Sequence, residues 1–261
     1  MRATRGLLLW SLALIVLGVV LLLNNFLLLS GFNADALWPL ILVVLGGVIL
    51  LRGDLVPSDE ARSFGITRGS VESAAIEISA AEIDVQLYAL QREGRLIAGQ
   101  YAANSRPSLD VQETHANLKM DRAATPWLSF ADWRVGLARD LPWSIFATTH
   151  LGQVQLDLTG LIVQRAVIAT GFGDVRLVCP QEAFEPLYVR STLGNIHVIV
   201  PPGYHVQVKT SGSPMFRIHV DENRFQPQED QRGVYLARDA AGAQPLIEID
   251  ISGTFGDAYL A

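Results

Sequence analysis

The five histidines have the widest chemical range of the side chains in this sequence, because an imidazole can bind a metal ion or move a proton near neutral pH. No two of them have the HxxxH or HExxH spacing of a helical zinc site. His197 and His219 occupy the polar side of two segments that alternate in hydrophobicity. If these segments are neighbouring strands, the imidazoles form a weak metal site or a pH-responsive pair; the ordinary alternative is solvated strand residues.

The sequence offers no recognisable nucleophile. Cys179 is the only cysteine, so it cannot form an internal disulfide or a CxxC site, and we expect a small buried core residue. No GxSxG motif occurs, and the serines of residues 211–213 have the composition of a turn. The GFGD segment at residues 171–174 lacks the GK[ST] ending of a phosphate loop. We therefore predict a protein that is not an enzyme and that carries no cofactor or metal ion.

Two amide or carboxylate side chains, Asp174 and Asn195, directly follow a glycine at the start of a strand-like segment. Rows of acidic turn residues bind calcium in some β-rolls, but those sites need dense GGxGxD repeats. Such repeats are absent, so we interpret the two side chains as acceptors for backbone amides in turns.

Charge is distributed unevenly along the chain. The first 52 positions hold four charged residues, whereas residues 53–261 hold 17 Lys and Arg against 25 Asp and Glu, a net of −8. An acidic domain repels phosphate backbones, so we expect no nucleic-acid partner.

The nearly uncharged N-terminal part contains two apolar runs, residues 6–29 and residues 36–51, separated by a short polar turn. The first run is long enough to cross a hydrocarbon layer about 30 Å thick, and the second is short for a full span. We predict a two-helix transmembrane hairpin over residues 1–52, in which Gly46 and Gly47 let the helices approach closely. A cleaved signal peptide is the rival interpretation, but the first run is too long and a second run follows it.

Orientation depends on three arginines. Arg2 and Arg5 precede the first run, Arg52 follows the second, and the intervening loop has no Lys or Arg. The positive-inside rule therefore places the N-terminus and the remaining domain in the cytoplasm, as parts of a multi-pass plasma-membrane protein. If the second run does not cross, the domain lies on the other side.

A repeat organises the rest of the chain. Three segments that start with glycine and then alternate apolar and polar residues begin 21 residues apart, at residues 152–158, 173–179 and 194–200. This period predicts stacked β-rungs, a β-solenoid (β-helix-like) domain over residues 71–261 that follows a linker over residues 53–70. Weaker copies on both sides of these segments are interpreted as terminal rungs, and the last residues as the closing rung.

Exposed aromatic residues are the best candidates for a partner surface. Residues 124–146 are interpreted as an insertion packed across one side of the stack, and they contain Trp127, Trp133 and Trp143. Phe172 and Tyr188 are further candidates. The alternative is that these side chains cover the ends of the stack as core.

Two sets of motifs resemble the LiaF-like family. The N-terminal set is Asn24-Asn25 and Leu37-Trp38-Pro39, and the C-terminal set comprises Gly152, the LDLT sequence of residues 156–159, Leu161, Gly171, the GDV sequence of residues 173–175, and Pro180. The first set resembles the LiaF-type transmembrane hairpin and the second the LiaF-like C-terminal β domain. The resemblance implies a bacterial membrane protein that regulates the cell-envelope stress response, with no catalytic residue. In that family, the named member restrains a sensor histidine kinase.

The leading hypothesis is therefore a membrane-anchored regulatory or scaffold protein that acts through protein–protein contacts. Its partners would be the lipid bilayer and a membrane protein such as a sensor histidine kinase, or a second copy of the chain. The alternative is an extracytoplasmic adhesin-like or carbohydrate-binding module.

Overall fold

The computed structural model describes residues 61–81, 83–91, 94–102, 105–122, 133–228, 230–238 and 245–261. The predicted transmembrane hairpin, with Gly46 and Gly47, lies outside these residues, and so does Trp127. Within the described ranges, no helix has the length and hydrophobicity needed to cross a bilayer.

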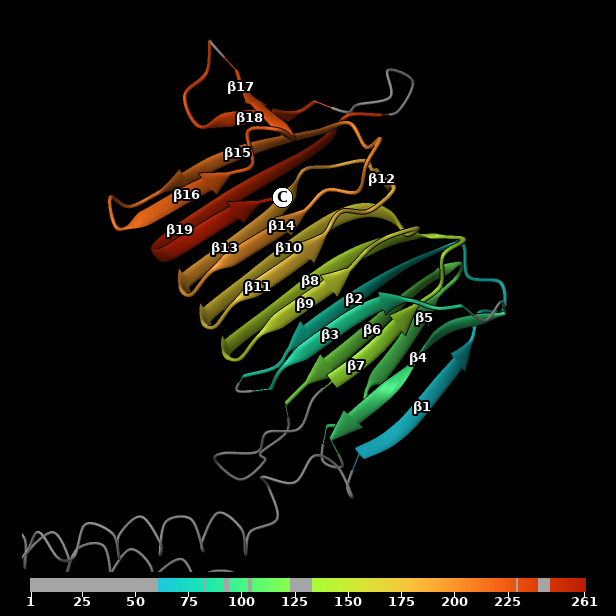
Figure 1. The fold of residues 1–261 in the computed structure, drawn as a ribbon. Helices are drawn as coiled ribbons and strands as arrows, with labels where there is room; N and C mark the ends of the chain where they lie inside the picture. Colours follow the sequence, from blue (N-terminus) through green and yellow to red (C-terminus); the bar gives the residue numbers. More distant parts are fainter. Residues whose placement is uncertain are drawn as a thin grey trace, which may run out of the picture. The chain divides into compact units, whose positions relative to one another are not determined.

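The described residues form an all-β domain, as the alternating pattern predicts (Figure 1). Its strands are β1 (Ala61–Thr67), β2 (Ser73–Ser79), β3 (Val85–Ala89), β4 (Arg95–Ala102), β5 (Ser108–Gln112), β6 (His115–Asp121), β7 (Trp133–Leu137), β8 (Pro142–Leu151), β9 (Val154–Asp157), β10 (Ile162–Phe172), β11 (Val175–Val178), β12 (Glu182–Ala183), β13 (Leu187–Leu193), β14 (Ile196–Ile199), β15 (Val206–Gly212), β16 (Phe216–Val220), β17 (Phe225–Pro227), β18 (Val234–Ala237) and β19 (Ile247–Leu260).

The strands form two sheets, and each rung of the domain gives one strand to each of them. Sheet B contains β8, β10 and β13 in parallel, and sheet A contains β9, β11 and β14 in parallel. Residues that pair between successive rungs, such as Val154, Val175 and Ile196, are 21 residues apart. The long strand β19 contributes to both sheets, so hydrogen bonds connect all the described strands.

The order of strands in space differs from their order in the chain. Strand β19 lies between β13 and β15 in sheet B, and strand β2 lies between β6 and β8 (Figure 1). The expectation that the last residues form a terminal rung is therefore wrong. A physical reason is that β19 carries Ile247, Ile249 and Ile251 on its inner side, and pairing on both edges buries these side chains completely.

The core lies between the two sheets and is filled by the inward residues of each strand. Trp133 in β7 and Trp143 in β8 are 0% and 1% exposed, so their interpretation as a partner surface is wrong. The predicted insertion over residues 124–146 is corrected too, because β7 and the first part of β8 are ordinary rung strands. A large ring between two sheets removes more apolar area from water than it can at the surface. Cys179 is fully buried, as predicted.

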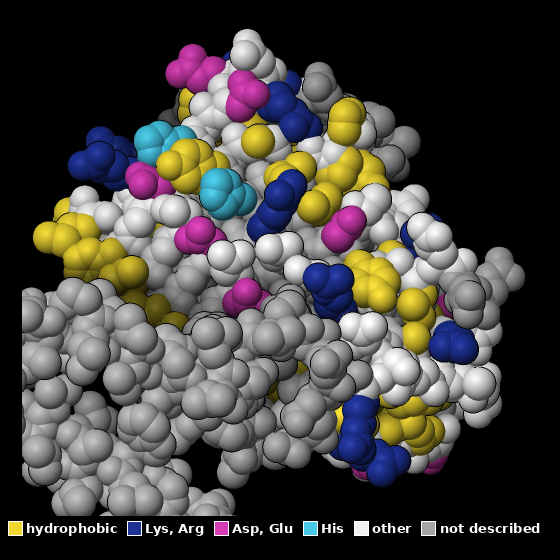
Figure 2. Space-filling view, turned by 60° about the horizontal axis from the view of Figure 1, so that its bottom comes forward, with side chains coloured by type: hydrophobic (Ala, Val, Ile, Leu, Met, Phe, Trp, Pro, Cys, Tyr) yellow, Lys and Arg dark blue, Asp and Glu magenta, His cyan; other side chains and the backbone are white. Residues whose placement is uncertain are grey.

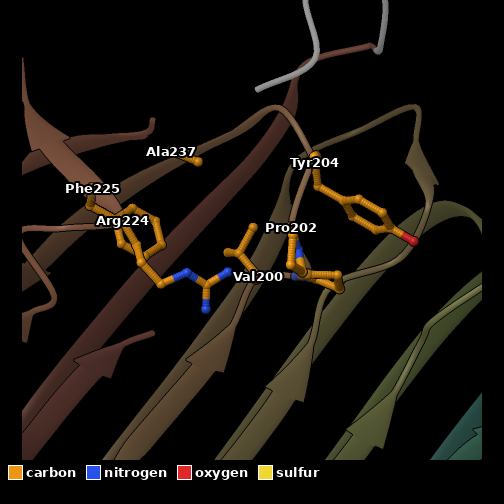
Figure 3. Close-up of a pocket in the computed structure, with 8 residues that line it drawn as sticks. Val200, Pro202, Tyr204, Arg224, Phe225 and Ala237 are labelled. Atoms are coloured by element: carbon orange, nitrogen blue, oxygen red, sulfur yellow. Dashed lines mark hydrogen bonds between the residues drawn. The ribbon is translucent and has the colours of Figure 1, made fainter. Parts of the chain in front are cut away.

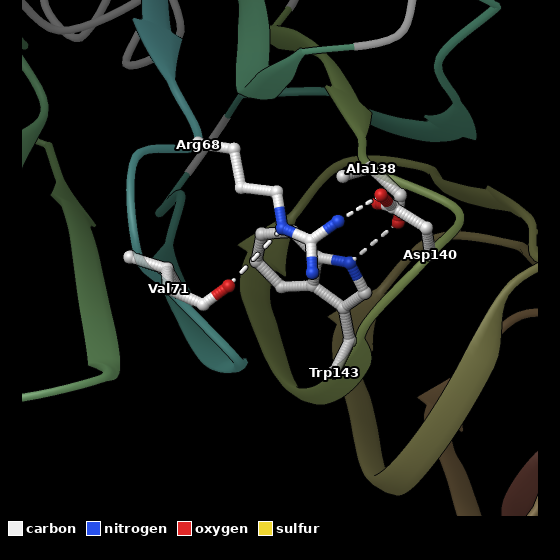
Figure 4. A network of polar contacts seen from close by, with 5 residues as sticks. All are labelled: Arg68, Val71, Ala138, Asp140 and Trp143. Atoms are coloured by element: carbon white, nitrogen blue, oxygen red, sulfur yellow. Dashed lines mark hydrogen bonds and ion pairs between the residues drawn. The ribbon is translucent and has the colours of Figure 1, made fainter.

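The domain begins earlier than the sequence indicates. Residues 61–67 were expected in the linker but form strand β1, which pairs antiparallel with β4. An edge strand buries little area and keeps a polar composition, which resembles that of a linker. The Arg68 side chain, just after β1, binds the carboxylate of Asp140 and donates to the Val71 carbonyl at 3.1 Å (Figure 4). In the same corner, the Trp143 indole donates to the Ala138 carbonyl at 2.8 Å, so the β7–β8 turn is fixed from two sides.

Close backbone packing explains the repeated glycine. A Cβ atom on Gly173 would lie 2.0 Å from the carbonyl oxygen of Gly152, and one on Gly194 would lie 2.0 Å from that of Gly173. Both residues also have φ near +150°, which L side chains rarely adopt. Each rung therefore turns from sheet B into sheet A where only a hydrogen atom fits.

Candidate functional site

A shallow groove runs across the outer face of sheet B, over β10, β13, β19 and β15, with a volume of about 560 Å³. Small outward residues form its floor, because Ala169, Ser252 and Ser211 lie in register with Arg190. Tyr188 lies on the same strand as Arg190, two residues earlier, and is 42% exposed. The groove therefore combines an aromatic face with a guanidinium group on a rigid, flat support.

Charged side chains border the groove. Lys209 of β15 donates to the Glu248 carboxylate at 3.1 Å, and this hydrogen bond raises the pKa of Lys209. Asp250 pairs in register with Tyr188 on one side and Lys209 on the other. Within the described part of the chain, the Arg190 side chain has no hydrogen-bond or ion-pair partner. The groove thus has both donors and acceptors available beside an exposed ring.

Such an arrangement can bind a polar ligand that also has an apolar face. A tyrosine ring packs against the apolar face of a sugar, while guanidinium and carboxylate groups form paired hydrogen bonds with neighbouring hydroxyls. In the described residues, the pKa shifts that are resolved fall on Cys179, Tyr204 and Lys209. Of these three groups, Lys209 lies at the groove, where it is paired with Glu248.

The outer face of sheet A carries a row of stacked rings. His197 of β14, Tyr259 of β19 and His219 of β16 stack in that order, with centroid distances of 4.8 and 4.9 Å and interplanar angles of 9° and 12° (Figure 2). The two histidines share the outer face of sheet A, but their strands are not neighbours, because β19 lies between β14 and β16 and places the Tyr259 ring between the imidazoles. The His219 Nε2 atom is 3.0 Å from Asp257. Because the rings face each other through Tyr259, the two imidazoles do not converge on one ion.

The turn acids have a structural role. The Asp174 carboxylate accepts a hydrogen bond from the backbone N–H of Asn195 at 2.7 Å, and the Asn195 side-chain oxygen accepts one from Asp257 at 3.1 Å. Asp84 accepts in the same way from Gln153 at 2.7 Å. The prediction that these side chains bind backbone amides is confirmed. Among the described residues, no cluster of three or more His, Cys, Asp and Glu is arranged to hold a metal ion.

A second cavity, near the β17–β18 hairpin, is too small for a substrate. It lies between residues 200–204 and Arg224, Phe225 and Ala237, and its volume of about 10 Å³ has room for about one water molecule (Figure 3). The Arg224 guanidinium binds the Val200 carbonyl across it. Burial raises the pKa of the Cys179 thiol to about 12, and the nearby Arg224 charge lowers that pKa only slightly in comparison.

Of the residues proposed from the sequence as a partner surface, the structure keeps Phe172, which is 56% exposed, and places Tyr188 in the groove. Sequence reasoning missed Arg190, Lys209 and Asp250. A signal for part of the groove was present, since Val167, Tyr188 and Lys209 follow the same 21-residue spacing. This spacing is hard to recognise in the sequence, because residues on the outer face of a sheet follow no hydrophobic pattern.

No protein-family model matches the chain, and no curated protein matches its sequence. A solved structure with a similar fold is a "putative cell adhesion protein" from Clostridium sporogenes, at 13% identity and a TM-score of 0.64, covering 77% of this chain and 97% of that one. A "putative adhesin" from Bacteroides fragilis aligns at 10% identity over 78% of this chain and 99% of that one, with a TM-score of 0.30. The first likeness shows that this chain shares the fold of the C. sporogenes protein.

Proposed function

We propose that the protein is an adhesin-like binding module of the cell envelope, anchored in the membrane by its N-terminal apolar segment. Its β domain, a β-solenoid, holds an extended, hydroxyl-rich ligand of the carbohydrate class and performs no reaction on it. The observation that carries this proposal is the open groove on sheet B, in which Tyr188 lies beside Arg190 and Asp250. An open groove on a flat sheet suits a polymer, which enters from the side and continues beyond the site.

The fold supports the same reading. The similar C. sporogenes structure bears the name of a cell adhesion protein, and its fold is shared over most of this chain. Stacked parallel strands give a rigid outer face, so a bound polymer needs little further ordering of the protein.

This function requires the β domain to lie outside the cytoplasm. The first apolar run would then act as the anchor, and the short second run, residues 36–51, would not cross the bilayer. A reporter that is active only after export, fused after Ala261, tests this orientation. Activity of that reporter supports the proposal, whereas activity of a cytoplasm-only reporter at the same position contradicts it.

Glycan binding is tested with the full chain in lipid nanodiscs, on a glycan array and with soluble polysaccharides. The variant Tyr188→Ala removes the groove ring and should weaken binding by about tenfold or more, the loss expected for one well-packed aromatic anchor. Tyr88→Ala is a matched control, because Tyr88 is 41% exposed but lies on sheet A. Absence of binding to any glycan, or an equal loss in the two variants, would contradict the proposal.

The second candidate is a membrane-anchored regulator of the envelope stress response that acts on a sensor kinase, as in the LiaF-like family. The two apolar runs with Gly46 and Gly47 favour it. The LiaF-like residues of the β domain argue for it less, because Gly173 and Asp174 have structural roles in the turns. Detergent extraction followed by affinity purification distinguishes the candidates. Stoichiometric recovery of a membrane kinase, with no glycan binding, would favour the regulator.

A further inference from the structure

Four large apolar side chains form an exposed column along the turns between the sheets. They pair in register on successive rungs and are each followed by the rung glycine, with exposed fractions of 57% for Leu151, 56% for Phe172, 47% for Leu193 and 44% for Phe255. We call these four residues the turn column. With strands about 4.8 Å apart, the column is about 14 Å long.

The turn column is not needed to close the core. The inward residues that precede it, such as Thr170 and Ser191, already close the core, and their hydroxyls donate to the carbonyls of Gly152 and Gly173. Contiguous exposed apolar side chains on a soluble surface mark a contact with another apolar surface. The column is therefore a docking surface whose occupant must be apolar.

The position at which the chain enters the domain identifies that occupant. Strands β9, β11 and β14 begin at the turn-column edge, because each follows a turn from sheet B to sheet A. Strands β3 and β7 run parallel to β9, so they begin at the same edge. Ala61, the first residue of β1, pairs with Ala102 at the end of β4, and Gln100 of β4 pairs with Arg134 at the start of β7. The chain therefore enters at the edge that carries the column. Residues 52–60, which precede β1, can span at most about 30 Å.

We propose that the turn column rests on the surface of the lipid bilayer that holds the N-terminal apolar segment, with its four side chains among the headgroups and upper acyl chains. The proposal rests on the membrane anchoring stated above. The strands then stand roughly upright on the membrane and the stack axis runs along it. In this orientation the outer faces of both sheets stay open to the side, so the groove with Tyr188 remains accessible to a polymer.

Site-directed fluorescence in the full chain tests the proposal. Phe172→Cys and Phe184→Cys are each labelled with an NBD maleimide in nanodiscs that contain doxyl-labelled phosphatidylcholine, which quenches NBD at the headgroup and upper-chain level. Phe184 is the matched control, because it is 64% exposed and lies at the opposite edge, next to the start of β10. Cys179 needs no replacement, because its thiol is fully buried in the core and the maleimide cannot reach it.

The expected result is quenching at position 172 that exceeds quenching at position 184 by several-fold, with a similar pattern for Leu193→Cys. Equal quenching at the two edges, or none at either, overturns the docking. Efficient crosslinking between two Phe172→Cys chains by a short bis-maleimide, without quenching, also overturns it and assigns the column to a second copy. Incorporation into nanodiscs is measured separately by flotation, so a chain that fails to float contradicts the anchoring and not merely the docking.

Discussion

The central rungs and the two flanks of the β domain follow different rules. From β8 to β14, each rung follows its neighbour both in the chain and in space. Pairing residues are 21 positions apart, except before the register shift near the start of β10, where they are 20 apart. In the flanks, β2 and β19 are inserted between strands that come from other parts of the chain. The difference teaches that a sequence period specifies the shape of a rung but does not specify which rungs are neighbours.

The flanks also contain the open edges of the sheets, which the central rungs do not have. A stack of parallel strands leaves open edges at both ends, where other chains can pair. Among the described strands, antiparallel pairing covers both sheets at one end, with β4 on sheet A and β5 on sheet B. At the other end the β17–β18 hairpin covers sheet B, whereas sheet A stops at the short parallel strand β16. The central rungs are covered by each other and need no such protection.

The largest predicted effect is at a central turn. Gly173→Ala should destabilise the domain by roughly 4 kcal/mol or prevent folding, because the new Cβ would lie 2.0 Å from the Gly152 carbonyl at a φ of +149°. Gly69→Ala is the control, since Gly69 has a φ of +59° but no atom near the added Cβ, and should cost about 1 kcal/mol. Chemical unfolding followed by tryptophan fluorescence measures both, and equal losses would mean that backbone strain alone explains the central glycines.

The second prediction asks whether β19 is as interior as a central strand. Ile249→Ala in β19 and Ile168→Ala in β10 should each cost about 3 kcal/mol, because both side chains are 0% exposed and leave similar cavities. The same unfolding measurement applies. A cost for Ile249→Ala well below that of Ile168→Ala would place β19 at the end of the stack, as the sequence order suggests.

This contrast explains how far the sequence could be read. The alternation in residues 152–158 and 173–179 specified strands, faces and turns, because burial on one side of a strand imposes a period of two. The insertion of β19 depends on its pairing with β13 on one side and β15 on the other, which no local pattern encodes. Trp133 and Trp143 were ambiguous for a similar reason, since an aromatic residue in an irregular stretch suits either a surface or a core.

The candidate sites follow the same division. The outward positions of His197 and His219 were predictable from the alternation, but the Tyr259 ring that separates them was not, because it comes from the inserted strand β19. The turn column was within reach of sequence reasoning, since a large apolar residue precedes each rung glycine. The exposure of these side chains could not be predicted, because residues beside a turn can point inward or outward.

The third prediction concerns pH. Burial raises the pKa of Cys179 to about 12 in the folded protein, above its value in the unfolded chain, so the folded state keeps the proton that the unfolded state loses. Stability should therefore fall above pH 9, by about 1.4 kcal/mol per pH unit until the folded pKa is reached. Cys179→Ala lacks this dependence. The measurement is the difference between the two unfolding curves at pH 8 and pH 10, which removes contributions from lysine and tyrosine. Identical slopes would show that water reaches the thiol in the central rungs.

The smallest predicted effect on stability compares a side-chain hydrogen bond that joins two rungs with one that lies within a single rung. Asp174→Ala removes the acceptor for the Asn195 amide of the next rung and should cost about 1 kcal/mol, because that amide is left partly buried without a partner. Asp157→Ala is the control, because Asp157 accepts a hydrogen bond from the Thr159 backbone N–H at 3.1 Å within its own exposed turn. This variant should lose only about 0.3 kcal/mol of stability. Amide hydrogen exchange sharpens the test, because faster exchange at Asn195 in the first variant reports the lost bond directly. Unchanged exchange at Asn195 would mean that the backbone ladder alone holds the turns in register, and that the side-chain row contributes nothing to the order of the central rungs.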